Sequence, residues 1–228
     1  MLTQSAIHTG STRRAANGLR QDPGASHSLT DSINMMGAVM PFARNVEIYG
    51  EDEPADYLYK VVSGAVRTYR VLADGRRQIG AFYLPGDVFG LETGEEHSFS
   101  AEAVADAKIL VIKRSTLLSL ADRDNEIARQ LWTMTGRELR HVQERILLLI
   151  KTAKERVIGF LLEMAERTSA RNQVELPMSR QDIADYLGLT IETVSRTLTD
   201  LESAAAIELP SSRRIVLCNR AALGRLNG

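Results

Sequence analysis

Hydrophobic and polar positions follow two different periods along this chain, one in its first half and one in its second. Between residues 44 and 113, β-branched and aromatic runs are broken at short intervals by turn residues, a pattern typical of short strands. Asp74-Gly75 lies between the runs 66–72 and 78–83, and this dipeptide is a strong hairpin signal. Strands at such regular spacing predict a small β-barrel.

The second half of the chain has the helical period. Residues 125–150 carry apolar side chains at steps of three and four between charged flanks, which predicts a helix with a narrow apolar seam of the coiled-coil kind. A helix of this length spans about 37 Å, which suits pairing with a second copy of the chain; packing on the chain's own barrel is the alternative. The seam residues that we expect to mediate dimerisation are Leu139, Val142, Ile146 and Leu149.

A second amphipathic helix and a polar link with one short apolar strand lead to the most informative stretch, residues 179–202. Ser179 is followed three residues later by an acid, which is a helix-start signature. Gly188 suits a sharp turn at the end of that helix, and Thr190 is a good cap for the next one. Helix, short glycine turn and helix form the helix-turn-helix motif, whose second helix enters the DNA major groove.

The second of these helices divides into an apolar face and a polar face. An arginine fork matches O6 and N7 of guanine, and a carboxylate accepts from the amino group of cytosine. The polar face therefore predicts base reading, while an ordinary i, i+4 ion pair between Glu192 and Arg196 is compatible with it. The apolar face holds Val194, Leu198 and Leu201, and the polar face holds Glu192, Ser195, Arg196 and Thr199.

A wing is predicted behind this motif. Residues 207–210 and 214–217 are short apolar runs on either side of a polar turn. The tip carries two arginines, a residue type suited to phosphate contacts. The residues that we expect to contact the DNA backbone are Ser179, Arg180, Thr190, Thr193, Thr199, Arg213 and Arg214.

Length and composition place these elements in an ordinary globular protein. The chain has 228 residues, of which 44% are hydrophobic and 25% charged, enough for one large domain or two modest ones. Residues 1–30 are polar and aperiodic and predict a flexible tail. We expect four parts: the tail (1–30), a sensor-like barrel domain (31–122), the dimerisation helix (123–150) and a winged helix-turn-helix DNA-binding domain (151–228).

The charge distribution limits how DNA could be bound. The 28 Lys and Arg against 29 Asp and Glu leave a net charge of −1. Even residues 151–228 carry only 11 basic against 10 acidic side chains, so phosphate attraction alone would bind weakly. Base reading must then contribute much of the useful affinity.

The single cysteine, Cys218, excludes several chemistries. One thiol cannot form an internal disulfide, and an iron–sulfur cluster normally takes four. We expect Cys218 to be a small core residue beside the wing strand. The four histidines lack metal-ligand spacing, and the longest aliphatic run, 146–150, is far too short to span a membrane. With no signal peptide recognised, we expect a cytoplasmic protein without cofactor or membrane contact.

The order of tail, barrel, long helix and winged helix-turn-helix resembles the CRP/FNR superfamily of bacterial transcription regulators over about residues 35–220. Residues 182–196 are a highly specific match, and residues 74–78 and 85–90 resemble the FixK branch. The resemblance implies an α+β fold with a cyclic-nucleotide-binding-like jelly roll, a long dimerisation helix and a C-terminal winged helix-turn-helix. It further implies a dimer on a two-fold symmetric site with TTGAT-type half-sites.

The resemblance also assigns roles to the reading set. By family role, Arg196 would contact guanine, Glu192 cytosine and Ser195 the outer thymine region. Cyclic-AMP-responsive relatives carry an additional arginine one position before the glutamate, where this chain has Ile191. This difference favours an FNR-type site over a CRP-type site.

Two departures from the family pattern bear on regulation. The family holds a cyclic-nucleotide phosphate with an Arg-Ser pair, but the matching region here begins with Glu95 and Glu96 and has no arginine. The N-terminal cysteine cluster of the oxygen-sensing relatives is also absent. The resemblance therefore implies a regulator that works with RNA polymerase, without cyclic nucleotide or iron–sulfur cluster, as an activator of genes for low-oxygen respiration and nitrogen fixation.

Two alternatives stay open at this point. The first is the same DNA-binding regulator gated by an unidentified small ligand in the barrel. The second and more remote is a cupin-like enzyme, which needs two or three histidines and a carboxylate facing into the barrel. Only His97 lies where it could supply such a ligand. The sequence therefore favours a regulator over an enzyme.

Overall fold

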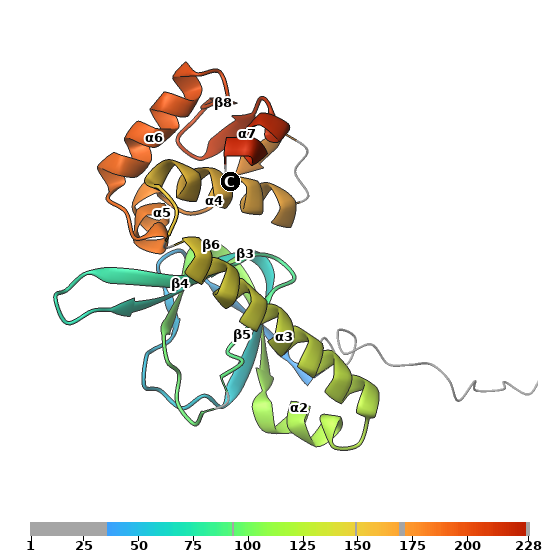
Figure 1. Ribbon diagram of the computed structural model, residues 1–228. Coiled ribbons are helices and arrows are strands. Elements are labelled where there is room, and N and C mark those ends of the chain that lie inside the picture. Colours follow the sequence, from blue (N-terminus) through green and yellow to red (C-terminus); the bar gives the residue numbers. More distant parts are fainter. Residues whose placement is uncertain (1–35, 93, 149, 169–171, 227–228) are drawn as a thin grey trace, which may run out of the picture.

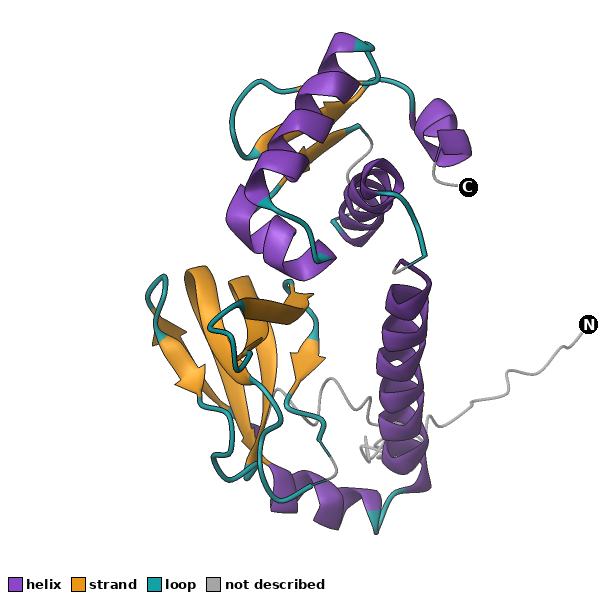
Figure 2. Ribbon diagram, turned by 60° about the vertical axis from the view of Figure 1, so that its left-hand side comes forward, coloured by secondary structure: helices purple, strands orange, loops and turns teal. Residues whose placement is uncertain are grey.

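The computed structural model describes residues 36–92, 94–148, 150–168 and 172–226 (Figure 1). A lobe of strands and a mainly helical lobe lie one above the other, and a long helix runs beside the strand lobe up to the helical lobe (Figure 2). The flexible tail predicted for residues 1–30 lies outside the described residues.

The first half of the chain forms six antiparallel strands, which we call the β-domain (residues 38–113). The strand order is β1-β6-β3-β4, with β2 paired to β6 and β5 to β3. Register shifts within the long β3–β6 pair bend and twist these strands. The strands are β1 (Ala38–Phe42), β2 (Glu47–Tyr49), β3 (Tyr57–Val71), β4 (Arg77–Tyr83), β5 (Val88–Phe89) and β6 (Ser100–Lys113).

The hairpin predicted at Asp74-Gly75 joins β3 to β4. Val71 pairs with Arg77 across it, and the backbone N–H of Gly75 donates to the carbonyl of Leu72 at 2.8 Å. Gly75 has a φ of +82°, which glycine adopts without a Cβ clash. Figure 1 shows this hairpin projecting from the side of the β-domain. The strand pattern and its strongest turn are therefore confirmed.

Three helices follow the β-domain: α2 (Arg114–Ala121), α3 (Asn125–Leu148) and α4 (Ala153–Arg167). Asp124 precedes α3, and its Oδ1 accepts from the backbone N–H of Glu126 at 2.8 Å. The 24 residues of α3 confirm the predicted long helix. Three seam residues stay exposed rather than packing on the β-domain, at 58% for Leu139, 51% for Val142 and 59% for Ile146. The side chain of the fourth, Leu149, lies outside the described residues.

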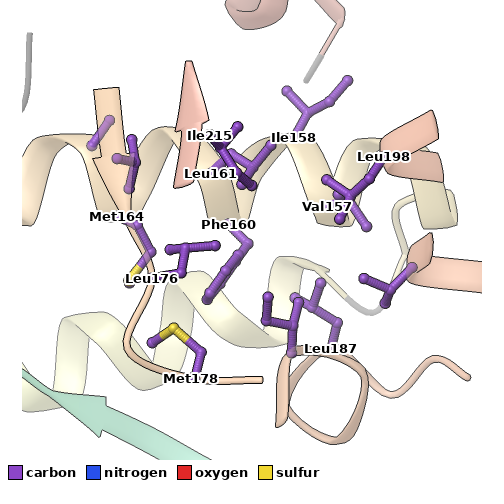
Figure 3. Packing of buried hydrophobic residues seen from close by; sticks show 14 of the residues in the cluster. Val157, Ile158, Phe160, Leu161, Met164, Leu176, Met178, Leu187, Leu198 and Ile215 are labelled. Atoms are coloured by element: carbon purple, nitrogen blue, oxygen red, sulfur yellow. The ribbon is translucent and has the colours of Figure 1, made fainter. Parts of the chain in front are cut away.

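The helical lobe contains a three-stranded sheet in the order β7-β9-β8 together with α4 and three further helices. Helix α4 is the second amphipathic helix predicted from the sequence, and its apolar face is buried among residues of the neighbouring elements, which include Leu198 and Ile215 (Figure 3). That face consists of Val157, Phe160, Leu161 and Met164. The remaining elements are β7 (Gln173–Glu175), α5 (Arg180–Leu187), α6 (Ile191–Ser203), β8 (Ile207–Glu208), β9 (Arg214–Leu217) and α7 (Arg220–Leu226).

The hydrophobic core of the helical lobe continues into the β-domain. Phe82 of β4 belongs to the same buried cluster as Phe160 of α4, and their ring centroids are 6.2 Å apart. Ile79 of β4 is also part of this cluster and is fully buried. Because a shared apolar core resists separation, the two lobes are held in a defined relation to each other.

The prediction of a buried Cys218 is wrong, because this thiol is exposed. Side chains alternate between the two faces of a strand, and on β9 Ile215 and Leu217 are the buried pair. Cys218 follows directly after Leu217, and its backbone N–H donates to the carbonyl of Ala206. Its side chain therefore points to the opposite, solvent-facing side.

Replacing Gly188 with alanine should lower the free energy of unfolding by about 1–2 kcal/mol, because a Cβ crowds the left-handed conformation. Gly188 ends α5 at a φ of +64°. Urea denaturation measures the change. Gly224 lies in α7 with nothing within 4 Å of an added Cβ, so Gly224→Ala is the control and should be neutral or stabilising by up to about 1 kcal/mol. Equal losses in the two variants would contradict this account of Gly188.

Candidate nucleic-acid interface

The first helix of the predicted motif, α5, begins with a complete capping box. The Ser179 hydroxyl accepts from the backbone N–H of Asp182 at 3.1 Å. In return, Oδ2 of Asp182 accepts from the backbone N–H of Ser179 at 2.9 Å. Both unsatisfied donors at the helix start thus find partners. The start predicted at Ser179 is confirmed.

A short turn connects α5 to α6. Gly188 adopts the left-handed conformation, and the backbone N–H of Leu189 donates to the carbonyl of Ala184. The Thr190 hydroxyl then accepts from the backbone N–H of Thr193 at 3.2 Å and caps α6. This turn sets the direction of α6 and places Thr190 and Thr193 at its beginning.

Helix α6 separates into two faces in the way that its spacing predicts. The apolar face is fully buried, whereas Glu192, Arg196 and Thr199 are exposed and Ser195 is half-buried. Figure 1 shows α6 at the outer edge of the helical lobe. The polar face is therefore open to a partner. The buried residues of the opposite face are Val194, Leu198 and Leu201, with Thr197 at its margin.

Glu192 and Arg196 supply the charges of the polar face, and both side chains are exposed. The pKa of Glu192 lies below its usual value because its carboxylate accepts hydrogen bonds from its own backbone N–H and from the Thr190 hydroxyl, with a smaller contribution from the charge on Arg196. Glu192 is therefore ionised at neutral pH. Within the described ranges, no hydrogen bond or ion pair engages the guanidinium of Arg196.

Arg180 connects the two helices of the motif. It is the first residue of α5, and its Nη1 lies 3.5 Å from Oγ of Ser195 on α6. The predicted backbone-contacting residues at the start of α5 therefore lie next to the predicted reading set. Eight of the expected contacts occur on these two helices or their caps: Ser179, Arg180, Thr190, Glu192, Thr193, Ser195, Arg196 and Thr199.

The remaining two predicted backbone contacts lie on the wing. Arg214 is exposed at the first position of β9, and Arg213, directly before it, is half-buried. The Ser211 hydroxyl accepts from the backbone N–H of Arg214 at 3.1 Å and tightens the turn. Both arginines thus lie at the turn between β8 and β9, where the sequence predicts the wing.

Sequence reasoning missed a group of arginines that join the lobes. Arg67 and Arg77 of the β-domain both form ion pairs with Asp182 of α5, and Arg145 of α3 lies over the ring of Tyr186. The sequence signal was weak, because the partners are more than 100 residues apart for both pairs with Asp182. An arginine in a strand predicts a solvated side chain unless its partner is known.

Comparison with known proteins agrees with this architecture. Residues 39–124 match the cyclic nucleotide-binding domain family, and residues 155–226 match the Crp-like helix-turn-helix domain family. The nitrogen fixation regulation protein FixK of Azorhizobium caulinodans is 54% identical over 201 residues, covering 86% of this chain and 81% of that protein. FixK of Rhizobium meliloti is 42% identical, covering 79% and 82%.

Among solved structures, FixK2 from Bradyrhizobium japonicum is similar with a TM-score of 0.82 and 52% sequence identity, covering 85% of this chain and 98% of that one. The two domain families and this fold confirm the predicted barrel, long helix and winged helix-turn-helix. Because these relatives are regulators rather than enzymes, the cupin-like enzyme is set aside. In the described part of the chain, no helix combines the length and the apolar character needed to cross a bilayer.

Proposed function

This chain belongs to the CRP/FNR family of transcription regulators, in its FixK-type branch, and on that premise we propose that it reads a two-fold symmetric DNA site as a homodimer. The half-sites are of the TTGAT type. The observation that carries this proposal is the exposed polar face of α6, with Glu192 and Arg196 exposed on a helix whose other face is buried.

Each residue of the reading set has a distinct role. The Arg196 guanidinium donates to O6 and N7 of guanine, and the ionised Glu192 carboxylate accepts from the amino group of cytosine. Ser195 lies near the outer thymine. Its contact with Arg180 at 3.5 Å favours one orientation of the hydroxyl. Three neighbouring side chains thus discriminate among base pairs.

The contacts to the DNA backbone surround this face. Threonine hydroxyls and helix N-termini commonly bind phosphate oxygens and fix the register of the protein on the duplex. The starts of α5 and α6 both lie beside the reading face and supply such groups. We propose that phosphates are bound by Ser179, Arg180, Thr190, Thr193, Thr199, Arg213 and Arg214.

Dimerisation follows from the exposed seam of α3. Leu139, Val142 and Ile146 lie on one stripe of the helix and are each more than half exposed. A stripe of this spacing is the narrow seam along which two helices supercoil. Two copies joined there present two α6 helices to DNA, and half-sites in such dimers lie about 34–36 Å apart.

We propose that DNA binding needs no effector. Aromatic rings fill the interior of the β-domain and stack on one another: the centroids of Tyr49 and His97 are 3.6 Å apart, and those of Tyr59 and Phe89 are 5.1 Å apart. In the segment where the family holds a cyclic-nucleotide phosphate, Glu95 and Glu96 are exposed acids. The ring stack occupies space and the acids repel a phosphate.

A ligand-gated regulator is the second candidate, and one observation favours it. The hydroxyl of Tyr49 and Nε2 of His97 are buried without a hydrogen-bond partner among the described residues. Nδ1 of His97 lies 3.3 Å from Oε2 of Glu92. Unsatisfied buried polar atoms require an explanation, and a small polar ligand at this point would satisfy them.

Refolding separates the two candidates. Protein purified under denaturing conditions and refolded carries no small molecule from the cell. If it binds a TTGAT palindrome with the affinity of natively purified protein, DNA binding is effector-free. A requirement for the small-molecule filtrate of a cell extract would instead support the ligand-gated regulator. A scrambled palindrome is the control for both.

The family also implies the cellular role. We propose a cytoplasmic activator that acts with RNA polymerase on genes of nitrogen fixation and low-oxygen respiration, in line with the names of the FixK relatives. The measurement is transcription in vitro with purified polymerase and a promoter that carries the palindrome. Transcription that does not rise when the protein is added would contradict the activator role.

Replacing Arg213 with alanine should weaken specific and non-specific DNA binding alike. Arg213 lies on the wing tip, and loss of one phosphate contact reduces the slope of log affinity against log salt concentration by about 1. Fluorescence anisotropy on the palindrome and on scrambled DNA between low and high salt measures this. A loss confined to the palindrome would show that Arg213 reads bases instead.

A further inference from the structure

The β-domain contacts the helical lobe through α5, the first helix of the helix-turn-helix motif. Asp182, in the first turn of α5, has a side chain only 5% exposed. Its Oδ2 caps the helix start, and its Oδ1 accepts from Nη1 of Arg67 at 2.9 Å and from Nη2 of Arg77 at 2.6 Å. One carboxylate therefore fixes the helix start and joins it to strands β3 and β4.

A second set of contacts reaches the next turn of α5. Nε of Arg77 donates to Oδ2 of Asp185 at 2.9 Å, so its guanidinium spans two carboxylates. Nε2 of Gln78 donates to the backbone carbonyl of Asp185 at 2.7 Å. The bond between Arg77 and Asp185 joins two charged groups, and such hydrogen bonds are shorter and stronger than neutral ones.

Arg145, at the end of α3, connects both lobes to the dimerisation helix. Its guanidinium donates to the backbone carbonyls of Ile79 and Gly80 in β4. It also lies 4.5 Å from the ring centroid of Tyr186 in α5. We call the three arginines with their partners Asp182, Asp185 and Tyr186 the arginine clamp.

Apolar packing reinforces the clamp. The ring centroid of Tyr186 lies 5.2 Å from that of Phe82 in β4 and 5.8 Å from that of Phe160 in α4. Beside this core, Nη2 of Arg167 in α4 donates to the backbone carbonyl of Phe82 at 2.7 Å and to Oδ2 of Asp87 at 2.6 Å. The helical lobe is thus held at several points and cannot swing freely about the connection between α3 and α4.

A fixed lobe matters for a dimer that binds two half-sites. The seam on α3 fixes the two copies relative to each other, and the clamp fixes α6 relative to α3. The separation and relative rotation of the two α6 helices are then set before DNA is bound, so binding does not have to order them. A loosened clamp would let each α6 adjust to its own half-site.

We propose that the arginine clamp sets the half-site spacing that the dimer accepts, with Arg67 and Arg77 as positioning residues that never touch DNA. This inference rests on the proposed two-fold symmetric site. It assigns the β-domain a role in specificity, because strands β3 and β4 orient a helix that reads DNA.

Three DNA probes test this proposal: the TTGAT palindrome at its preferred spacing, the same palindrome with two added base pairs, and a single half-site. Two base pairs rotate one half-site by about 70° relative to the other. Arg77→Gln should reduce the preference for the native spacing by about 10-fold, because it removes the charged hydrogen bonds to Asp182 and Asp185. Its affinity for the single half-site should stay within about twofold of the wild type, because the reading face is untouched.

Arg76→Gln is the matched control. It removes the same charge from the neighbouring position, but the Arg76 side chain is 78% exposed and pairs with Asp74 at the hairpin tip. Its spacing preference should equal that of the wild type. Asp185→Asn removes the α5 partner of Arg77 and should reduce the spacing preference as Arg77→Gln does. The double variant should lose little more of the spacing preference than either single variant.

The outcomes are distinguishable. An unchanged spacing preference in both Arg77→Gln and Asp185→Asn overturns the proposal. So does an equal loss on the palindrome and on the half-site in both variants, because that pattern reports destabilised folding rather than positioning. If the wild-type protein itself binds the palindrome no better than the half-site, the two-fold symmetric site is contradicted, and the inference fails with it.

Discussion

Replacing Ile146 with aspartate should make the protein monomeric and lower its affinity for the palindrome by about 100-fold or more, since two linked contacts become one. Ile146 is 59% exposed on α3 and lies on the same stripe as Leu139 and Val142. In a paired helix the two aspartates would face each other in an apolar seam, where burying unpaired charges is costly. Sedimentation analysis and binding titrations on the palindrome measure the two effects.

The control for Ile146→Asp is Leu118→Asp. Leu118 lies on α2 and is 55% exposed, so the variant introduces the same charge at an equally accessible apolar position away from the seam. It should remain dimeric and bind DNA as the wild type does. A dimeric Ile146→Asp protein with unchanged DNA affinity would show that α3 is not the dimer interface. Retention of single half-site binding by the monomer would confirm that its reading helix is intact.

Arg196→Ala should cost about 1–3 kcal/mol in binding free energy on the palindrome and relax discrimination at one base pair of each half-site. Arg196 is exposed on the polar face of α6, and its fork matches the two acceptors on the major-groove edge of guanine. Alanine removes both donors. Titrations against palindromes substituted at each position in turn identify the base pair whose identity no longer matters.

Arg196→Lys is the informative companion to Arg196→Ala. Lysine keeps the positive charge but lacks the planar fork that makes the bidentate contact. Binding to scrambled DNA should therefore stay near the wild-type value in Arg196→Lys, while discrimination at the guanine is lost. If Arg196→Lys preserved full discrimination, or if Arg196→Ala weakened palindrome and scrambled DNA equally, Arg196 would be a phosphate contact and not a base reader.

The sequence predicts the reading motif well because its signals are local. The capping box at Ser179, the left-handed turn at Gly188 and the two faces of α6 each depend on residues within one or two helical turns. The hairpin at Asp74-Gly75 has the same character. These features need no knowledge of the rest of the fold, so periodicity and turn chemistry are sufficient to place them.

Features that depend on distant parts of the chain were not predictable in this way. The ion pair between Arg67 and Asp182 joins residues 115 positions apart, and a single sequence holds no signal for that pairing. The general tendency of cysteine to be buried predicts a core position for Cys218, but the alternation of side chains along β9, with Ile215 and Leu217 buried, leaves Cys218 exposed. The face of a side chain in a short strand depends on register, which the sheet as a whole determines.

The most direct test of this account is selection of bound sequences from random DNA by the refolded protein without added ligand. We predict enrichment of a two-fold symmetric site with TTGAT-type half-sites at one fixed spacing, and loss of one position of the consensus when the selection is repeated with Arg196→Ala. Recovery of single half-sites without fixed spacing would contradict the proposal that the protein binds DNA as a dimer. Recovery of no preferred sequence would contradict the assignment of α6 as the reading helix.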